Sequence, residues 1–247
     1  MTSRFQDRTV VVTGGSTGLG YGTAERLIAE GATVYIVGRR QAELDHAAER
    51  LGSSAIPIQA DVTRLDDLDR LYAAVAERSV RLDAVVANAG GPSFGTIETY
   101  TGDELDASYA LNLRAVAFTV QKALPLMTTG GSVVLMSSIE GERGSAGLGA
   151  YAAMKAAQQS MARTWANELS SRGIRVNAIS PGVIYTPAYA SAGWTLEQAE
   201  AVIPLIPAGR LGLEAEVGAA IAFLASDDSS FVNGTNLVVD GGQTEVV

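Results

Sequence analysis

A tyrosine and a lysine four residues apart form the clearest chemical pair in this sequence. Tyr151 and Lys155 lie in a stretch, Ala150 to Ser171, whose apolar spacing predicts a long helix. Residues at positions i and i+4 share one face of a helix, so the phenol and the ammonium group should be neighbours. A free tyrosine titrates near pH ~10, and a nearby ammonium group lowers that pKa. The pair therefore predicts an acid/base group tuned toward neutral pH.

Ser138 is a second candidate for catalysis. It follows the apolar run Val133 to Met136, which predicts a strand over Ser132 to Met136. Open parallel sheets bind ligands at the carboxyl ends of their strands, where the Ser138 hydroxyl could hold a substrate oxygen and stabilise charge on it. The adjacent Ser137 could do the same, and two serines could also simply cap a strand end.

A buried polar residue is predicted on a neighbouring helix. Asn112 lies between Leu111 and Leu113 in a predicted helix from Ala107 to Val120. An amide among leucines needs hydrogen-bond partners, which could be those of an ordinary core asparagine or those of a catalytic site.

A glycine-rich segment, Thr13 to Gly20, follows the β-branched run Thr9 to Val12 and precedes a predicted helix from Gly22 to Glu30. Strand, glycine turn and helix in this order predict a site for a dinucleotide pyrophosphate. Glycines let the backbone approach the phosphates, and the helix N-terminus offers free N–H groups. A purely structural turn is the alternative.

The elements that would position these residues alternate regularly along the chain. Further strands are predicted at Thr33 to Val37, Ala55 to Gln59, Asp83 to Ala87, Arg175 to Ile179 and Asn236 to Val239. Further helices are predicted at Gln41 to Leu51, Leu65 to Arg78, Asp103 to Met127 and Glu214 to Ala225, the third of which could form two pieces. Apolar strands alternating with helices indicate an α/β fold, a Rossmann-like doubly wound sheet of seven parallel strands with helices on both faces. We expect one domain over residues 1–247.

The longest irregular stretch is predicted at Pro181 to Leu213, after the carboxyl end of a strand. It is rich in apolar and aromatic side chains. A long apolar loop at that edge of a sheet suggests a substrate lid, which we place around 183–212.

Composition excludes several kinds of site. The chain has no cysteine and one histidine, His46, which rules out thiolate chemistry and a three-histidine metal centre, so no metal is expected. Its 27 acidic and 18 basic residues give a formal charge of −9, which disfavours a nucleic-acid surface. No signal segment or membrane span is evident, and a cytoplasmic location is the default expectation.

Taken together, these motifs resemble the short-chain dehydrogenase/reductase family, in its single-domain branch of about 250 residues. The resemblance extends from Thr13 to Gly242 and includes the TGxxxGxG spacing, the YxxxK pair and a serine 13 residues before the tyrosine. It implies an NAD(P)-dependent oxidoreductase that interconverts a secondary alcohol and a ketone. It also implies that Asn112, Ser138, Tyr151 and Lys155 form the catalytic set, with Asn112 kinking its helix and ordering a water in a proton relay.

The resemblance further implies which residues hold the cofactor. These are Gly14, Ser16, Thr17, Gly18, Leu19, Gly20, Asp61, Val62, Asn88, Ala89, Gly90, Tyr151, Lys155, Pro181, Gly182, Ile184 and Thr186. Asp61 would accept from the adenine amino group. Ile184, through its backbone, and Thr186, through its hydroxyl, would meet the nicotinamide carboxamide.

Arg39 and Arg40 bear on the choice of cofactor. NAD-binding sheets of this kind usually carry an acid after the second strand, where this chain has Gly38 and then Arg39. A guanidinium group suits the 2′-phosphate of NADP(H), which we therefore favour. NAD(H) remains possible, because both arginines could be solvated charges at a helix start. In addition, Thr17 stands where many NADP-preferring relatives have a second basic residue.

The substrate pocket is less well marked. Candidate wall residues are Glu140, Leu148, Tyr185, Tyr189 and Trp194. Glu140 could bind a polar or cationic substrate group or could be an outward surface carboxylate. The aromatic residues suggest a partly apolar substrate, but they could equally pack the lid onto the body of the protein.

Other functions remain to be weighed. A non-catalytic nicotinamide-binding sensor or scaffold would be expected to lack Tyr151 or Lys155, and both are present. Sugar epimerases of this fold usually show another glycine spacing, and enoyl reductases space the tyrosine and lysine more widely.

Relatives of this size are usually homotetramers, with interfaces on the helices predicted at Ala150 to Ser171 and Glu214 to Ala225.

Overall fold

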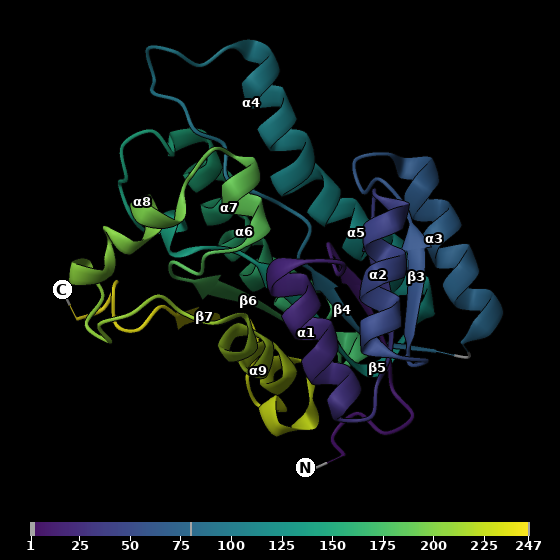
Figure 1. The fold of residues 1–247 in the computed structure, drawn as a ribbon. Helices are drawn as coiled ribbons and strands as arrows, with labels where there is room; N and C mark the ends of the chain where they lie inside the picture. The colour runs from purple at the N-terminus through teal and green to yellow at the C-terminus, as the bar shows by residue number, and fades with distance from the viewer. Residues whose placement is uncertain (1–2, 80, 247) are drawn as a thin grey trace.

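The computed structural model describes residues 3–79 and 81–246, and within them the strands form one seven-stranded parallel sheet (Figure 1). The strands are β1 (Thr9–Thr13), β2 (Thr33–Gly38), β3 (Ala55–Gln59), β4 (Leu82–Ala87), β5 (Met127–Met136), β6 (Arg175–Pro181) and β7 (Asn236–Val239). Their order is β3-β2-β1-β4-β5-β6-β7. The predicted α/β fold with seven parallel strands is confirmed. The strand order reverses between β1 and β4: β2 and β3 lie on one side of β1, and β4 to β7 lie on the other. Sheets of this kind bind ligands at the point where the strand order reverses.

Helices connect the strands. They are α1 (Gly18–Ala29), α2 (Gln41–Leu51), α3 (Leu65–Arg78), α4 (Gly102–Tyr109), α5 (Ala115–Ala123), α6 (Gly149–Glu168), α7 (Pro187–Ser191), α8 (Leu196–Glu200) and α9 (Glu214–Ala225). Helices α1, α2 and α9 lie on one face of the sheet, and α3, α5 and α6 lie on the other (Figure 1). The sheet is therefore covered on both sides, as its uniformly apolar strands require.

The core is divided by the sheet into two halves. Successive side chains of a strand point to opposite faces, so Val11 packs with α3, α5 and α6 while Val10 and Val12 pack with α1, α2 and α9. All three valines are fully buried. This two-sided packing fixes the sheet rigidly and leaves the turns at its carboxyl edge free to form a site.

The helical stretch predicted from Asp103 to Met127, in one piece or two, is divided into several pieces and ends before Met127. Helix α4 ends at Tyr109, a π turn (η1) occupies Ala110–Arg114, and α5 is followed by a 3-10 turn at Leu124–Leu126. A π turn accommodates one extra residue and bends the helix, which places Asn112 at a kink. Met127 belongs to β5 because it pairs with Leu82 before a shift in register, so the strand predicted at Ser132 begins earlier.

Two further predicted boundaries are corrected. The helix predicted to end at Ser171 ends at Glu168, and the Ser170 hydroxyl, which donates to the Asn167 carbonyl at 2.7 Å, competes with the helical bonds there. The stretch predicted to be irregular between Pro181 and Leu213 contains α7, α8 and a 3-10 turn at Ile203–Leu205. Thr195 forms a capping box with Gln198 that starts α8.

The helix predicted to start at Gly22 begins at Gly18, inside the glycine cluster itself. None of the helices among residues 3–79 and 81–246 has the length and apolar character needed to cross a membrane.

Candidate active site

A cleft of about 470 Å³ runs along the carboxyl edge of the sheet. All of the residues expected to contact a cofactor line it: Gly14, Ser16, Thr17, Gly18, Leu19, Gly20, Arg39, Arg40, Asp61, Val62, Asn88, Ala89, Gly90, Tyr151, Lys155, Pro181, Gly182, Ile184 and Thr186. We call this space the cofactor cleft. Its walls come from segments that follow β1, β2, β3, β4 and β6, so the parallel arrangement of the strands is what gathers these distant residues.

The turn after β1 forms a backbone cradle at the floor of the cleft. Gly14 and Gly18 have φ angles of +65° and +57°, which favour glycine. A Cβ atom on Gly20 would lie 2.0 Å from the carbonyl oxygen of Gly14. Thr17 makes no side-chain capping bond to α1, and the first turn of α1 holds no acidic residue. The helix start therefore presents N–H groups and a positive dipole end to the cleft, which suits phosphate groups.

Asn88 joins this turn to the segment after β4. Its Nδ2 donates to the carbonyl oxygen of Thr13 at 2.7 Å, and the Thr13 hydroxyl accepts from the backbone N–H groups of Asn88 and Ala89, each at 3.0 Å. These bonds hold two neighbouring strand ends in fixed register. The residue type at position 88 thus has a structural purpose that is independent of any direct contact with a cofactor.

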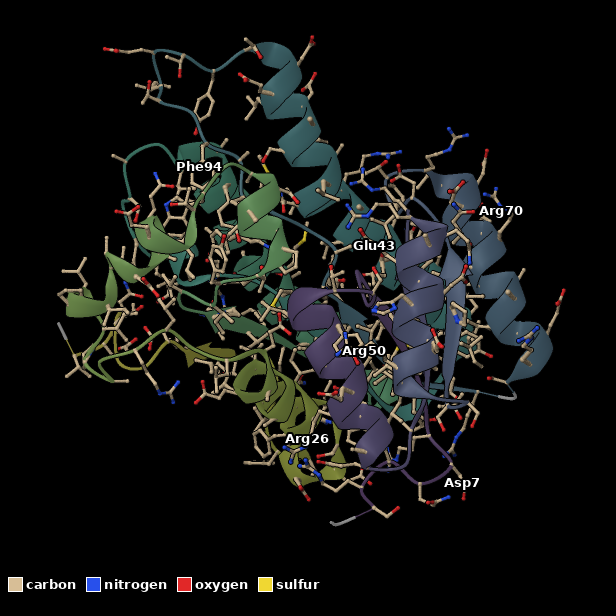
Figure 2. The ribbon with its side chains drawn as sticks, viewed as in Figure 1. Asp7, Arg26, Glu43, Arg50, Arg70 and Phe94 are labelled. Carbon is tan, nitrogen blue, oxygen red and sulfur yellow. The ribbon has the colours of Figure 1, made fainter. Side chains whose placement is uncertain are left out.

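The two arginines after β2 are not equivalent. Both are exposed and line the cofactor cleft. Arg40 forms an ion pair with Glu43, which lies near the start of α2 (Figure 2). Arg39 takes part in no ion pair among the described residues, while its backbone carbonyl accepts from Gln59 Nε2 at 3.0 Å. Arg39 is therefore the guanidinium group available to a ligand in the cleft.

Asp61 is held by local bonds at the end of β3. Its Oδ1 accepts from the backbone N–H and the hydroxyl of Thr63, at 3.0 Å and 2.7 Å. Its own backbone N–H donates to Asp67 Oδ2 at 2.9 Å. These bonds fix the carboxylate at the cleft wall.

Helix α6 brings Tyr151 and Lys155 into the cleft as the i and i+4 pair. The helix start is docked by the Tyr100 phenol, which accepts from the Ala150 N–H at 2.8 Å. Lys155 Nζ lies 5.4 Å from the centre of the Tyr151 ring and donates to the carbonyl oxygen of Met136 at 2.5 Å. The lysine is 2% exposed. Its position is therefore fixed between the end of β5 and the tyrosine.

The two serines after β5 have different partners. The Ser137 hydroxyl donates to the Lys155 carbonyl at 2.9 Å and so ties β5 to α6. The Ser138 hydroxyl accepts from the Glu140 N–H at 3.2 Å and is hydrogen bonded with the Tyr151 side chain. Because Ser137 is engaged with the backbone, the geometry favours Ser138 as the serine that acts beside the tyrosine.

Burial controls the ionisation of this pair. It raises the pKa of Tyr151 above its usual value, Tyr189 and Glu140 add to the rise, and the hydrogen bond with Ser138 opposes it. Burial also lowers the pKa of Lys155 to about 7. The sequence suggested that the ammonium group lowers the tyrosine pKa. In this structure the pKa of Tyr151 is raised instead, because burial removes solvation from the phenolate, and the opposing effect comes from the hydrogen bond with Ser138 rather than from Lys155.

Asn112 lies behind the cleft rather than in its lining. Its Oδ1 accepts from the Gly91 N–H at 3.1 Å, and its Nδ2 is 3.5 Å from the Ser108 hydroxyl. A Cβ atom on Gly90 would lie 2.9 Å from Asn112 Oδ1 and 3.5 Å from Lys155 Nζ. The absence of a side chain at Gly90 therefore lets the amide and the lysine approach the same point.

The expected substrate wall is assembled only in part. Tyr189 lines the cleft, and its ring lies 4.9 Å from that of Trp194. Glu140, Leu148, Tyr185 and Trp194 are outside the lining residues. Leu148 instead forms a β-bridge with Gly95, which packs the segment before α6 against the segment after β4.

Sequence reasoning missed several residues around the site. Gly91, Pro92, Leu111 and Met136 also line the cleft, and the first two directly follow the recognised Asn88–Gly90 segment. The buried amides of Gln158 and Gln159 were missed as well. The sequence does carry a signal for them: Gln158 and Gln159 lie three and four residues after Lys155, and therefore on the same face of the helix.

Comparisons with known proteins agree with this geometry. A family model described as enoyl-(acyl carrier protein) reductase matches residues 14–244. The oxidoreductase asL5 of Sarocladium schorii is 43% identical over 98% of each chain. A levodione reductase of Leifsonia aquatica is 37% identical over 98% of this chain and 96% of that protein. A cyclopentanol dehydrogenase of Comamonas sp. is 36% identical over 98% of each chain.

The fold comparison gives the same result. A crystal structure of levodione reductase superimposes with a TM-score of 0.92 at 33% identity, covering 99% of this chain and 100% of that one. A parallel sheet with a glycine cradle and a tyrosine–lysine pair defines a nucleotide-dependent oxidoreductase. The chain belongs to the short-chain dehydrogenase/reductase family, whose members use NAD(P).

Proposed function

We propose that this protein interconverts a secondary alcohol and a ketone with NADP(H), using Tyr151 as the acid/base. The carrying observation is that Tyr151, Ser138 and Lys155 converge inside the cleft that also contains the glycine cradle. The relatives named for levodione reduction and cyclopentanol oxidation support a reaction at an alcohol or ketone carbon.

The cradle at Gly14–Gly20 would hold the pyrophosphate, and Ile184 and Thr186, which are both buried and line the cleft, would hold the nicotinamide end. The bound nicotinamide supplies a hydride to the carbonyl carbon in reduction and accepts one from the alcohol carbon in oxidation. Every other function in the reaction falls to residues of this chain.

In the proposed reduction, the Tyr151 phenol donates its proton to the substrate oxygen as that oxygen gains charge. Ser138 donates a second hydrogen bond and orients the same oxygen. The raised pKa of Tyr151 keeps the phenol protonated through neutral pH and therefore ready to donate. Lys155 stabilises the phenolate left behind, and with a pKa of about 7 it can pass a proton on. In oxidation the same proton moves from the alcohol to Tyr151.

Two other proposals concern the surroundings of the site. Residues around 183–212, including α7, would form the substrate lid, because Tyr189 and Ser191 of α7 line the cleft. The chain would assemble as a homotetramer through α6 and α9, on which Ala156, Ala157, Ala219 and Ala220 are partly exposed. Light scattering on purified protein tests the assembly.

The test is turnover. Purified protein is incubated with NADPH or NADH and a panel of ketones, and the loss of reduced-nicotinamide absorbance is followed. An unsaturated acyl thioester is included, because the matching family model carries an enoyl reductase description. Ketone-dependent oxidation of NADPH supports the proposal. Turnover of the thioester alone favours enoyl reduction, and binding of a nucleotide without turnover of any substrate favours a sensor or scaffold.

A further inference from the structure

The helix that carries Tyr151 and Lys155 begins without a capping side chain of its own. Its N-cap residue is Leu148, which has no acceptor in its side chain, and the first turn of α6 contains no acidic residue. Helix starts leave N–H groups without partners, and a Ser, Thr, Asp or Asn at the N-cap usually accepts from one of them. Because Tyr151 is the third residue of α6, this uncapped turn is the one that holds the proposed acid/base.

Tyr100 supplies the missing acceptor from a distant part of the chain. Its phenol oxygen accepts from the Ala150 N–H at 2.8 Å, across a separation of 50 residues. Ala150 is buried and directly precedes Tyr151. The bond therefore fixes the backbone from which the Tyr151 ring projects, and it acts where an N-cap side chain would otherwise act.

The Tyr100 ring is itself held in one position. The backbone N–H of Tyr100 donates to the Thr96 carbonyl at 3.1 Å, and the next residue, Thr101, starts α4 through a capping box with Glu104. A Cβ atom on Gly95 would lie 2.6 Å from Cε1 of the ring and 2.8 Å from Cδ1, so the ring lies directly against the Gly95 backbone. A ring that is held in this way can keep the start of α6 in place.

A second contact joins the same two parts of the chain. The Gly95 N–H donates to the Gly147 carbonyl at 2.9 Å, and Gly95 forms a β-bridge with Leu148. The segment at residues 91–100 begins with Gly91, which lines the cofactor cleft. One short segment therefore reaches the cleft at its start and holds the first turn of α6 at its end.

We propose that Tyr100 is a positioning residue, whose hydroxyl holds the first turn of α6 so that the Tyr151 phenol meets the substrate oxygen beside Ser138. The inference rests on the proposed function, since it concerns the same proton transfer. Proton transfer needs the two heavy atoms at hydrogen-bond distance, and a misplacement of about 1 Å can lower a rate by about 10²-fold. Tyr100 is outside the lining of the cofactor cleft, so the affinity for the nucleotide should not depend on its hydroxyl.

The test begins with Tyr100→Phe, which removes the hydroxyl and keeps the ring. The assay uses the best ketone of the panel and the preferred nucleotide. We expect kcat to fall about tenfold or more, while the KM for the ketone and the Kd for the nucleotide stay within about twofold, because the bond matters when the proton moves. Tyr109→Phe, at an exposed tyrosine of α4, is the matched control and should keep kcat within about twofold.

A double-mutant cycle separates positioning of Tyr151 from general support of the fold. In the Tyr151→Phe background the phenol to be positioned is absent, so the addition of Tyr100→Phe should change the residual kcat by less than about twofold. A residue that only supports the fold would lower kcat by the same factor in both backgrounds.

Gly95→Ala displaces the phenol by a second route, because the added Cβ would overlap the Tyr100 ring while Tyr100 and Ala150 are both retained. Its kcat should fall in the same way. Gly102→Ala is its control, since a Cβ there meets no atom within 4 Å in the described part of the chain. If Tyr100→Phe does not fold, Gly95→Ala decides, alone and in the Tyr151→Phe background.

Two outcomes overturn the inference: an unchanged kcat in Tyr100→Phe, or a loss of kcat by the same factor with and without the Tyr151 phenol. Absence of turnover by the original protein, on any ketone with either nucleotide, would instead overturn the proposed function.

Discussion

The side-chain amide of Gln158 donates from Nε2 to the backbone carbonyl of Asn112 at 2.5 Å. Gln158 is fully buried on α6, three residues after Lys155, and Asn112 lies in the π turn that bends the neighbouring helix. The bond therefore joins the helix that carries the proposed acid/base pair to the kink. The family resemblance led us to expect an ordered water near Asn112, and here a protein side chain already occupies one acceptor position of its carbonyl.

We predict that Gln158→Met lowers the free energy of unfolding by about 1–3 kcal/mol, because methionine has similar length but leaves the buried carbonyl without its donor. Because the bond holds the kink beside Lys155, kcat should fall more than KM rises. Chemical denaturation and steady-state kinetics measure both. Gln121→Met, at an exposed position on α5, is the control and should change stability by less than about 0.5 kcal/mol. Equal stability of the two variants would show that the bond contributes nothing.

Lys155→Met should abolish most activity and yet change the pH dependence of stability in a defined direction. Unfolded lysine keeps its proton up to its ordinary pKa of 10.5, whereas burial lowers the pKa of folded Lys155 to about 7. Between these values the unfolded state binds more protons, so the stability of the original protein rises with pH. Below about pH 7, folded Lys155 is protonated, and its buried positive charge destabilises the protein. Methionine at this position carries no charge and removes this cost.

The free energy of unfolding of the original protein, minus that of Lys155→Met, should therefore increase by roughly 2–3 kcal/mol between about pH 7 and about pH 9. Denaturant titrations of both proteins at the two pH values give this difference, and groups common to both proteins cancel in it. A difference that is constant with pH would mean that Lys155 keeps an ordinary pKa in the folded state.

Tyr151→Phe removes the proposed proton donor and leaves the ring. We expect kcat for ketone reduction to fall by about 10²–10⁴-fold, with the affinity for NADPH reduced by less than about tenfold, because the phosphate cradle is untouched. Fluorescence titration of NADPH separates the two effects. Tyr109→Phe, at an exposed tyrosine of α4, serves as the control for general damage. A loss of NADPH binding that matches the loss of kcat would remove the case for Tyr151 as an acid/base.

The sheet could be predicted because its signal is local and strong. Val10, Val11 and Val12 are β-branched and uninterrupted, which is typical of a strand buried on both faces. Parallel strands then place every following loop at one edge, so the cleft could be anticipated from the glycines and polar residues at the strand ends without any knowledge of long-range contacts.

The rest of the site depends on contacts that one sequence does not display. The π turn at Ala110–Arg114 adds a single residue to a helix whose amphipathic spacing is otherwise continuous, so the spacing predicted a helical stretch in one piece or two but not where it bends. The raised pKa of Tyr151 arises from burial, which depends on how the segments around α6 pack and which the i and i+4 spacing of tyrosine and lysine does not display. Glu140 could be read equally well as a surface group or a pocket group, and the structure leaves it outside the residues that line the cofactor cleft, an outcome that depends on how distant segments pack.

Gly20→Ala should damage the cradle. The added Cβ would lie 2.0 Å from the Gly14 carbonyl oxygen and 2.6 Å from Asn88 Nδ2, contacts that force the turn after β1 to move. We expect a loss of stability of about 1–3 kcal/mol together with weaker binding of both NADPH and NADH. Gly144→Ala is the matched control, since a Cβ there meets no atom within 4 Å among the described residues. Retention of full nucleotide affinity in a folded Gly20→Ala protein would count against the cradle.

Arg39→Ser tests the choice of cofactor. Arg39 is exposed in the cleft without an ion-pair partner among the described residues, whereas Arg40 is paired with Glu43. If Arg39 binds the 2′-phosphate, its loss should raise the Kd for NADPH by about tenfold or more and leave the Kd for NADH within about twofold. Arg40→Ser, with its charge already neutralised locally, should have the smaller effect. Added salt should reduce the difference in the Kd for NADPH between Arg39→Ser and Arg40→Ser, because salt screens exposed charges.

The complementary change is Gly38→Asp in the Arg39→Ser background. The Cβ of residue 38 would lie 3.3 Å from the Ser16 hydroxyl and 3.5 Å from Leu44 Cδ2, so a side chain fits there with only a small adjustment. A carboxylate at this strand end can accept from a ribose 2′-hydroxyl and repels a 2′-phosphate. The double variant should therefore bind NADH more tightly than NADPH, in contrast to the original protein. If the original protein already binds NADH as tightly as NADPH, Arg39 is only a solvated charge at the start of α2, and the preference for NADP(H) is wrong.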